Sequence, residues 1–238
     1  MLVSVIIPAL NEVENVADCV AAARRDYVPD EVEIIVVDGG STDGTSGRVP
    51  SDATVLRSPR GRAVQLNRGA AASRGEILVF CHADSRLPAG WREAVIEALQ
   101  RPGVSGGTFQ TLILPEEGSL ILWVRNRIAF PASWKVMYGD QVQFVPRETF
   151  ERVGGFPEIP LMEDVELSRA LDEIGELVRI RSSLRVVTSS RRFLERGALV
   201  QSLMNAWSMF RYLHLGATPE EIARGYRSSR EEALCEGN

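Results

Sequence analysis

The chain has 238 residues, of which 45% are hydrophobic, which is enough for one sizeable domain or a domain with a small appendage. Its 27 basic and 32 acidic residues give a formal net charge of −5, which argues against nucleic acid as a partner. The sequence has no apolar run of about 18 residues and no basic leader followed by a signal segment. We therefore expect a cytoplasmic protein without a spanning helix, whose scattered cysteines are reduced thiols.

Short apolar runs alternate with helical patterns through the first half of the chain. Residues 2–7 and 31–37 are nearly all apolar, as in strands buried on both faces, and residues 54–56 form a weaker third run. After the first run, Asn11 has the position of a helix cap, with Glu14 at capping-box spacing. The alternation predicts an α/β fold with a mostly parallel central sheet flanked by helices.

Polar residues follow two of the buried runs, where open α/β sheets bind their ligands. The second run ends at Asp38 and a glycine-rich loop, and residues 77–80 lead into His82 and Asp84. Asp84 offers the hard oxygen that Mg²⁺ or Mn²⁺ prefers, and His82 lies two residues away on the same side of an extended chain. An ordinary strand-to-helix loop, with Asp84 as a cap, explains the same residues.

Residues 53–75 contain five arginines and no acid. A segment of one sign beside a metal site suits an anionic ligand such as a diphosphate, and Arg60 and Gln65 are its better candidates for contact. The alternative is a solvated helix face, which we prefer for Arg68 and Arg74.

Three blocks of the sequence carry a family resemblance: SVIIPALNE at residues 4–12, VVDGGSTDGT at 36–45, and ILVFCHAD at 77–84. In order and spacing they resemble the family 2 glycosyltransferases of GT-A fold. The resemblance implies a Rossmann-like GT-A domain over residues 1–190, followed by a C-terminal helical extension over 191–238. His-Ala-Asp, in place of the common Asp-x-Asp, also resembles a small bacterial branch described as radical-SAM/selenodomain-associated transferases.

The resemblance implies roles for the residues at these strand ends. Asp38 would hydrogen-bond the base, typically uracil, and Asp84 would hold Mn²⁺ or Mg²⁺ on the diphosphate. His82 replaces an acid, so its neutral imidazole could instead donate a hydrogen bond to ribose or phosphate. The full set predicted to contact the nucleotide is Pro8, Ala9, Asn11, Glu12, Asp38, Gly39, Arg60, Gln65, His82 and Ala83.

A pair of acids, Glu163 and Asp164, opens a helical pattern after residues 153–157, which resemble the Gly-Gly-Phe turn of the family. Carboxylates in a first turn favour the helix dipole, which explains the pair without chemistry. The resemblance implies instead the general base of an inverting displacement at the anomeric carbon. We assign that base to Asp164, with Glu163 as an orienter or as the alternative base.

Further contacts to the donor or acceptor are predicted at Gly107, Asp140, Gln141, Arg191 and Arg192. Gly107 lies in a strand region over residues 104–114, where a sugar could sit against bare backbone. The two arginines follow two short apolar runs, at 177–180 and 184–188, which suggest the strands of a hairpin. They could clamp a diphosphate or be surface charges.

Two other segments have apolar faces. Residues 119–130 could form a core helix, one side of an acceptor groove, or a patch that rests on a membrane. Residues 197–216 have apolar residues at helical spacing and predict an amphipathic helix. That helix could pack on the domain, form a homodimer, or make a peripheral contact with the inner face of the membrane.

The leading hypothesis is an inverting, metal-assisted glycosyltransferase that moves a sugar from a nucleotide-diphosphate donor, such as a UDP-sugar, to a hydroxyl of a small metabolite or lipid. A nucleotidyltransferase shares the layout, but it would show a Gly-rich, Lys-containing loop where residues 8–12 stand. A non-catalytic nucleotide-sugar-binding protein is the third hypothesis, because His82 replaces an acid. The sequence identifies neither the sugar nor the acceptor.

Overall fold

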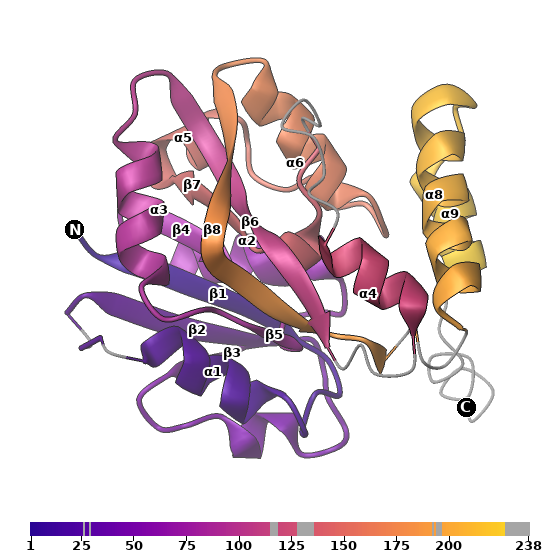
Figure 1. Cartoon of the computed structure of the whole chain (residues 1–238). Coiled ribbons are helices and arrows are strands. Elements are labelled where there is room, and N and C mark those ends of the chain that lie inside the picture. Colours follow the sequence, from indigo (N-terminus) through magenta and orange to yellow (C-terminus); the bar gives the residue numbers. More distant parts are fainter. Residues whose placement is uncertain are drawn as a thin grey trace.

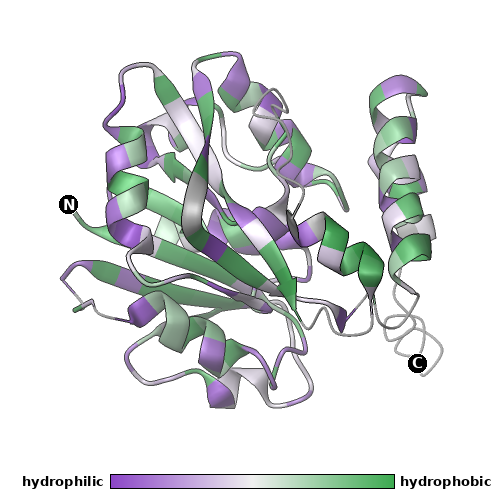
Figure 2. Cartoon of the chain, viewed as in Figure 1, coloured by the Kyte–Doolittle hydropathy of each residue, from purple (hydrophilic) through white to green (hydrophobic). Residues whose placement is uncertain are grey.

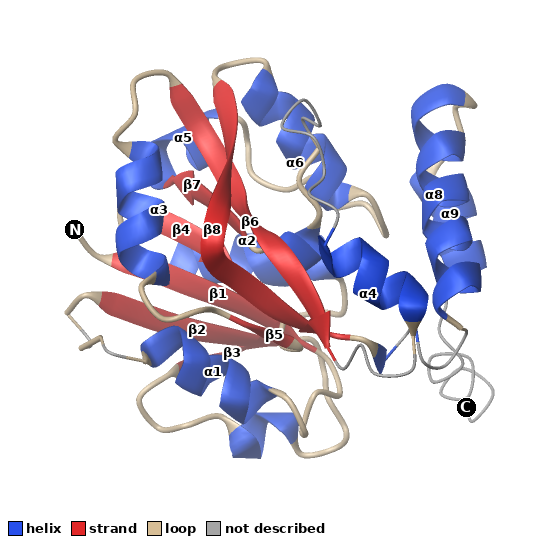
Figure 3. Ribbon diagram, in the orientation of Figure 1, coloured by secondary structure: helices blue, strands red, loops and turns tan. Residues whose placement is uncertain are grey.

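The computed structural model describes residues 1–25, 27–28, 30–114, 119–127, 136–191, 193 and 197–226. In these residues, a single sheet forms the centre of the fold, and helices cover both of its faces (Figures 1 and 3). The strands are β1 (Val3–Ala9), β2 (Val32–Asp38), β3 (Thr54–Arg57), β4 (Ile77–Phe80), β5 (Ser85–Arg86), β6 (Val104–Leu114), β7 (Gln143–Pro146) and β8 (Glu176–Ser189). The helices are α1 (Val16–Arg24), η1 (Thr45–Arg48), α2 (Arg62–Ala72), α3 (Trp91–Leu99), α4 (Leu120–Arg127), η2 (Gly139–Gln141), α5 (Arg147–Arg152), α6 (Glu163–Asp172), α8 (Ala198–His214) and α9 (Pro219–Tyr226).

The strand order in the sheet is β3-β2-β1-β4-β7-β6-β8-β5. Strands β1 to β4 pair in parallel, β7 is antiparallel to β4 and β6, β8 is parallel to β6, and β5 is antiparallel to β8. This confirms the predicted α/β fold with a mostly parallel sheet. Because β1, β2 and β4 run in the same direction, the loops that follow them meet at one edge.

Side chains alternate between two core layers, as the pleat of a strand requires. Val5 and Ile7 of β1 pack in the layer that includes Trp91 of α3. Ile6, between them, faces the opposite layer, with Leu66 of α2. Both faces of the central strands are therefore buried, which explains why their sequences are almost continuously apolar.

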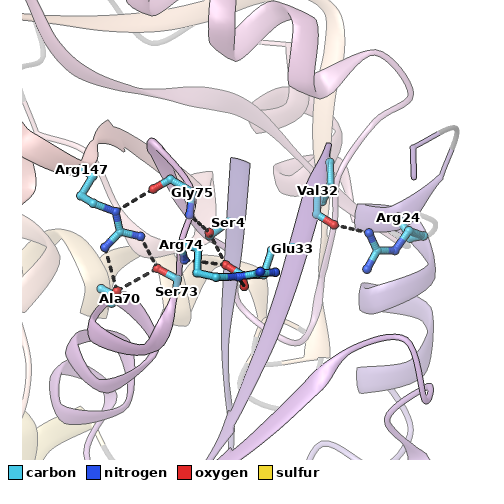
Figure 4. A network of polar contacts seen from close by, with 9 residues as sticks. All are labelled: Ser4, Arg24, Val32, Glu33, Ala70, Ser73, Arg74, Gly75 and Arg147. Atoms are coloured by element: carbon cyan, nitrogen blue, oxygen red, sulfur yellow. Dashed lines mark hydrogen bonds and ion pairs between the residues drawn. The ribbon is translucent and has the colours of Figure 1, made fainter. Parts of the chain in front are cut away.

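The opposite edge of the sheet, where β1, β2 and β4 begin, is held by a polar network (Figure 4). Ser4 Oγ donates to Glu33 at 2.7 Å and accepts from the backbone N–H of Gly75 at 2.8 Å. Arg74 donates to Glu33 through both its backbone and its side chain, and Arg147 donates to the Gly75 carbonyl at 2.7 Å. The contacts fix the starts of the strands, so this edge serves the fold.

The segment predicted as a hairpin is one continuous strand, β8, which pairs in parallel with β6. The sequence pattern showed two apolar stretches, 177–180 and 184–188, and both lie within β8. The register shifts between Phe109 and Gln110 of β6, opposite residues 180–185, so the irregularity that suggested a turn is a local break in pairing. The prediction of a hairpin is therefore wrong.

Gly107 lies in β6, at a position where that strand pairs with both β7 and β8. A Cβ on Gly107 would lie 2.5 Å from Phe144 Cζ and 2.5 Å from the Val178 carbonyl oxygen. The space predicted for a sugar is thus filled by a buried ring and by backbone. Gly107 allows close packing of three strands and leaves no room for a sugar on that face.

We expect Gly107→Ala to lower the free energy of unfolding by about 1–3 kcal/mol, because the added methyl overpacks a buried site. Gly47→Ala is the matched control, since a Cβ there meets no atom within 4 Å. Equilibrium urea unfolding of both variants measures the difference. Equal midpoints for the two would contradict the packing role of Gly107.

The C-terminal helices pack against α6. Met162 and Val165 share an apolar cluster with Ala217 and Ile222, next to Tyr212 of α8. The prediction of a helix over 197–216 is confirmed in α8, and Thr218 caps α9 as its sequence indicates. No helix in the described ranges has the length and apolar character needed to cross a bilayer.

Candidate active site

The loop after β1 is bound to the loop after β2. The backbone N–H of Asn11 donates to Ser41 Oγ at 3.0 Å, and Asn11 Oδ1 accepts from the Thr42 N–H at 2.9 Å. Asn11 has a φ of 54°, in the left-handed region. The predicted cap is therefore wrong: α1 begins at Val16, and Asn11 cross-links the two loops that would hold a nucleotide.

Asp38 ends β2 with only 5% of its surface exposed. Its Oδ1 accepts hydrogen bonds from the N–H groups of Gly40, at 3.1 Å, and Ser41, at 2.8 Å, and the Ser46 hydroxyl donates to Oδ2. Burial alone would raise the pKa of Asp38, but these hydrogen bonds outweigh it and lower the pKa. The carboxylate stabilises the loop. Its oxygens are largely buried and already accept hydrogen bonds, so little of their surface is available for the predicted contact with a base.

Gln65 points into the sheet, away from solvent. Its side-chain amide donates to the carbonyls of Ala9, at 2.9 Å, and Val37, at 2.7 Å. It also fills the space beside Gly39, where a Cβ would lie 3.0 Å from Gln65 Cδ. The structure thus corrects the prediction of a nucleotide contact, because Gln65 joins the ends of β1 and β2.

Pro8, Ala9 and Ala83 are buried, and the methyl groups of the two alanines pack in the core. The Ala9 carbonyl is occupied by Gln65 and by the Gly39 N–H. These residues lie under the two loops, and the prediction that they line the nucleotide pocket stays a prediction.

His82 and Asp164 both approach Gly139. A Cβ on Gly139 would lie 2.6 Å from His82 Nε2 and 3.5 Å from Asp164 Oδ2. His82 follows β4 in a turn closed by a hydrogen bond from the Ser85 N–H to its carbonyl, at 3.0 Å, and Asp84 lies within that turn. The predicted metal turn and the predicted base therefore occupy one region.

Asp164 lies in the first turn of α6. Its Oδ2 accepts from the Gly139 N–H at 2.7 Å, and its Oδ1 accepts from the Val165 N–H at 2.9 Å. Burial, together with the negative charge of Glu163, raises the pKa of Asp164 to about 6. A carboxyl that ionises this close to neutral pH has the property required of a general base.

Glu163 is buried, and its partner is Arg62, which opens α2. The Arg62 guanidinium forms an ion pair with Glu163 Oε1. The other oxygen, Oε2, accepts no hydrogen bond from any residue in the described part of the chain. Arg62 lay in the acid-free arginine segment, but the sequence could not single it out, because its partner is 101 residues away.

Asp84 is half-buried and lies two residues after His82 in the same turn. Within the ranges that the structure describes, no three His, Cys, Asp or Glu side chains gather as a complete metal site. A cation shared with a diphosphate needs only one or two protein carboxylates, since phosphate and water complete its shell. The donor set at this turn fits such a cation.

Arg191 follows β8 and reaches the loop after β1. Its guanidinium pairs with Glu12 Oε1 at 3.1 Å. This places a cation at the edge of the candidate nucleotide loops, and its contact with a diphosphate stays a prediction. Arg192, predicted to act beside it, lies outside the described residues.

The remaining predicted residues, Arg60, Asp140 and Gln141, differ in how far they are buried. Arg60 is exposed on the segment before α2, and Asp140 is half-buried in η2, one residue after Gly139. Gln141 is buried, and its side-chain oxygen accepts from the Tyr138 N–H at 3.3 Å. Gln141 therefore closes the turn around Gly139, and its contact with donor or acceptor stays a prediction.

A comparison with protein families decides what kind of protein carries this arrangement. Residues 4–156 match the model described as "Glycosyl transferase family 2". The chain belongs to glycosyl transferase family 2. The matched part contains the strand ends and loops described above, and it stops before Glu163 and Asp164.

The family 2 chain is similar in sequence to the glycosyltransferase AglE of Haloferax volcanii. The two are 32% identical over 111 residues, which are 43% of this chain and 36% of the relative. The chain thus spans little more than a third of that relative's length.

Solved structures confirm that the family 2 chain has a GT-A-type α/β fold. The mannosyltransferase PcManGT of Pyrobaculum calidifontis, solved with GDP-Man and Mn²⁺, is 26% identical, with a TM-score of 0.60 over 90% of this chain and 61% of that one. TarS residues 1–349 of S. aureus, solved with UDP, is 15% identical, with a TM-score of 0.60 over 100% of this chain and 75% of that one.

Proposed function

We propose that this protein transfers a sugar, with inversion, from a nucleotide-diphosphate donor to a hydroxyl acceptor. The observation that carries the proposal is the approach of both Asp164 and His82 to Gly139, with Asp84 in the same turn as His82. An inverting displacement needs a base on one side of the reacting carbon and charge stabilisation at the leaving group on the other. Asp164 belongs to α6 and Asp84 to the turn after β4, so the proposed base and the proposed metal ligand come from separate elements.

In the proposed reaction, Asp164 accepts the proton of the acceptor hydroxyl. The oxygen forms a bond to the anomeric carbon, and the bond from that carbon to the diphosphate breaks, leaving its electron pair on the diphosphate. The Gly139 and Val165 N–H groups hold the two oxygens of Asp164 in place. Glu163, held by Arg62, adds the negative charge that keeps the pKa of Asp164 high enough for it to act as a base.

Asp84, with His82 beside it, would hold a divalent cation on the donor. Mn²⁺ or Mg²⁺ at that position stabilises the negative charge of a departing diphosphate. PcManGT, the mannosyltransferase similar to this chain, was solved with Mn²⁺, which supports the use of a divalent metal. Arg191 lies at the same edge and suits the remaining phosphate charge.

We propose a UDP-sugar as donor, although the similar proteins include one solved with GDP-Man and one with UDP. The acceptor is a hydroxyl of a small metabolite or lipid. Membership of the radical-SAM/selenodomain-associated branch stays a prediction that rests on His82 and on Tyr138-Gly139-Asp140-Gln141.

A donor-hydrolysis assay tests the function against its alternatives. We expect a UDP-sugar, incubated with the full chain and Mn²⁺, to release UDP slowly without an acceptor and faster with a suitable hydroxyl acceptor. Chelation with EDTA should remove this activity. Release of pyrophosphate from UTP and a sugar phosphate would indicate a nucleotidyltransferase instead. Tight binding of all the donors tested, without release of UDP, would support a non-catalytic binder.

A further inference from the structure

Helix α8 exposes large apolar side chains, which a helix that only covers a core would bury. Its exposed residues include Leu199, Leu203, Trp207 and Phe210, which recur at the spacing of one helical face. Leu203 is 60% exposed and Trp207 is 57% exposed, whereas Gln201 is 2% exposed. Gln201 donates to Asn205 at 2.7 Å on the inner side. The helix thus turns amide side chains inward and large apolar side chains outward.

Helix α4 continues this apolar surface. It lies beside α8 at the same side of the molecule, and Figure 2 shows apolar residues along both helices. Leu120 is 74% exposed and Trp123 is 47% exposed, while Asn126 is buried and bonded to the backbone of Ile113. Of the three alternatives for residues 119–130, a helix buried in the core therefore does not describe the part that the structure covers. We call the exposed apolar residues of α4 and α8 the apolar face.

The charged residues within α4 and α8 have one sign. Neither α4 nor α8 contains an aspartate or a glutamate, although the chain has 32 acids and a net charge of −5. Arg127 lies at the end of α4, and Arg211 and His214 lie in the last turn of α8. Leu and Trp on one side, with arginine and no acid in the same two helices, is the composition of helices that lie in the interface of an anionic bilayer.

We propose that the apolar face seats on the surface of an anionic lipid bilayer, with α4 and α8 lying in the interfacial region. A second copy of the chain would bring like-charged arginines together, whereas acidic headgroups complement them. The exposed tryptophans suit the boundary between headgroups and acyl chains, where an amphipathic ring is stable. Large apolar side chains are exposed on two helices that contact each other, and soluble monomers seldom expose so many without a partner.

The apolar face is coupled to the catalytic helix. Tyr212 on the inner side of α8 donates to Glu166 at 2.7 Å, and the guanidinium of Arg169 lies 5.7 Å from the Tyr212 ring centroid. Both partners belong to α6, the helix that begins with Glu163 and Asp164. Seating the apolar face on lipid therefore fixes the orientation of α6 relative to the membrane.

Vesicle sedimentation tests the proposal with the full chain. We expect binding to vesicles of phosphatidylcholine mixed equally with phosphatidylglycerol, weaker binding to phosphatidylcholine alone, and a loss of affinity as salt is raised. Leu203→Ser combined with Trp207→Ser should weaken binding at least about tenfold, because two large apolar side chains no longer enter the lipid. Both side chains point outward, so the thermal melting temperature should change little.

Val28→Ser is the matched control, since Val28 is 56% exposed but lies outside both helices. It should bind as the unaltered chain does. Binding of the double variant equal to the control would overturn the proposal, as would absence of sedimentation with the mixed vesicles. A stable dimer in light scattering that the double variant abolishes, without vesicle binding, would assign the apolar face to a second copy. Because sedimentation needs no sugar transfer, its outcome is independent of the proposed function.

Discussion

Asp164→Asn is expected to lower kcat by about 10²–10⁴-fold, because an amide cannot take the proton of the acceptor hydroxyl. The two side chains have the same shape, and the single amide oxygen of asparagine can still accept one of the two backbone N–H groups that bond to Asp164 at the start of α6. The variant should therefore still fold and bind UDP. Rates of UDP release under saturating donor measure the effect, with calorimetric binding of UDP as the check on the site.

The pH profile gives the same assignment an independent test. Because the pKa of Asp164 is about 6, the carboxyl is ionised above that pH and protonated below it. A base acts only when ionised, so kcat/KM should fall as the pH drops through about 6. Glu163→Gln removes the neighbouring negative charge and should move this fall to lower pH while turnover persists. Turnover lost in Glu163→Gln but kept in Asp164→Asn would make Glu163 the base.

Asp84→Asn is expected to weaken the Mn²⁺-dependent part of UDP binding by at least about tenfold, since groups that only support a metal ligand already contribute 10–100-fold. An amide oxygen is a poorer ligand for a hard cation than a carboxylate. Titration calorimetry with UDP, in Mn²⁺ and in EDTA, separates the metal-dependent binding from the rest.

Asp52→Asn provides the matched control for Asp84, because Asp52 is exposed and pairs with Arg24 away from the turn after β4. It should leave both titrations unchanged. If Asp84→Asn also leaves the difference between Mn²⁺ and EDTA intact, Asp84 does not hold the cation.

The sequence predicted the strands well where burial on both faces forces a continuous apolar run, as in β1 and β2. It also placed Asp164 at the start of a helix, because first-turn acids leave a local pattern. It did not reveal that Gln65 points into the sheet or that Arg62 pairs with Glu163. Side-chain direction and contacts between distant segments depend on packing, which local spacing does not record.

Pairing between distant residues has a consequence for how the protein is made. Arg62 joins Glu163 across 101 positions, and Arg191 joins Glu12 across 179. A nascent chain leaves the ribosome from its amino end, so the early strands emerge long before their catalytic partners. The site proposed for sugar transfer therefore cannot be complete until α6, which supplies Glu163 and Asp164, has been synthesised.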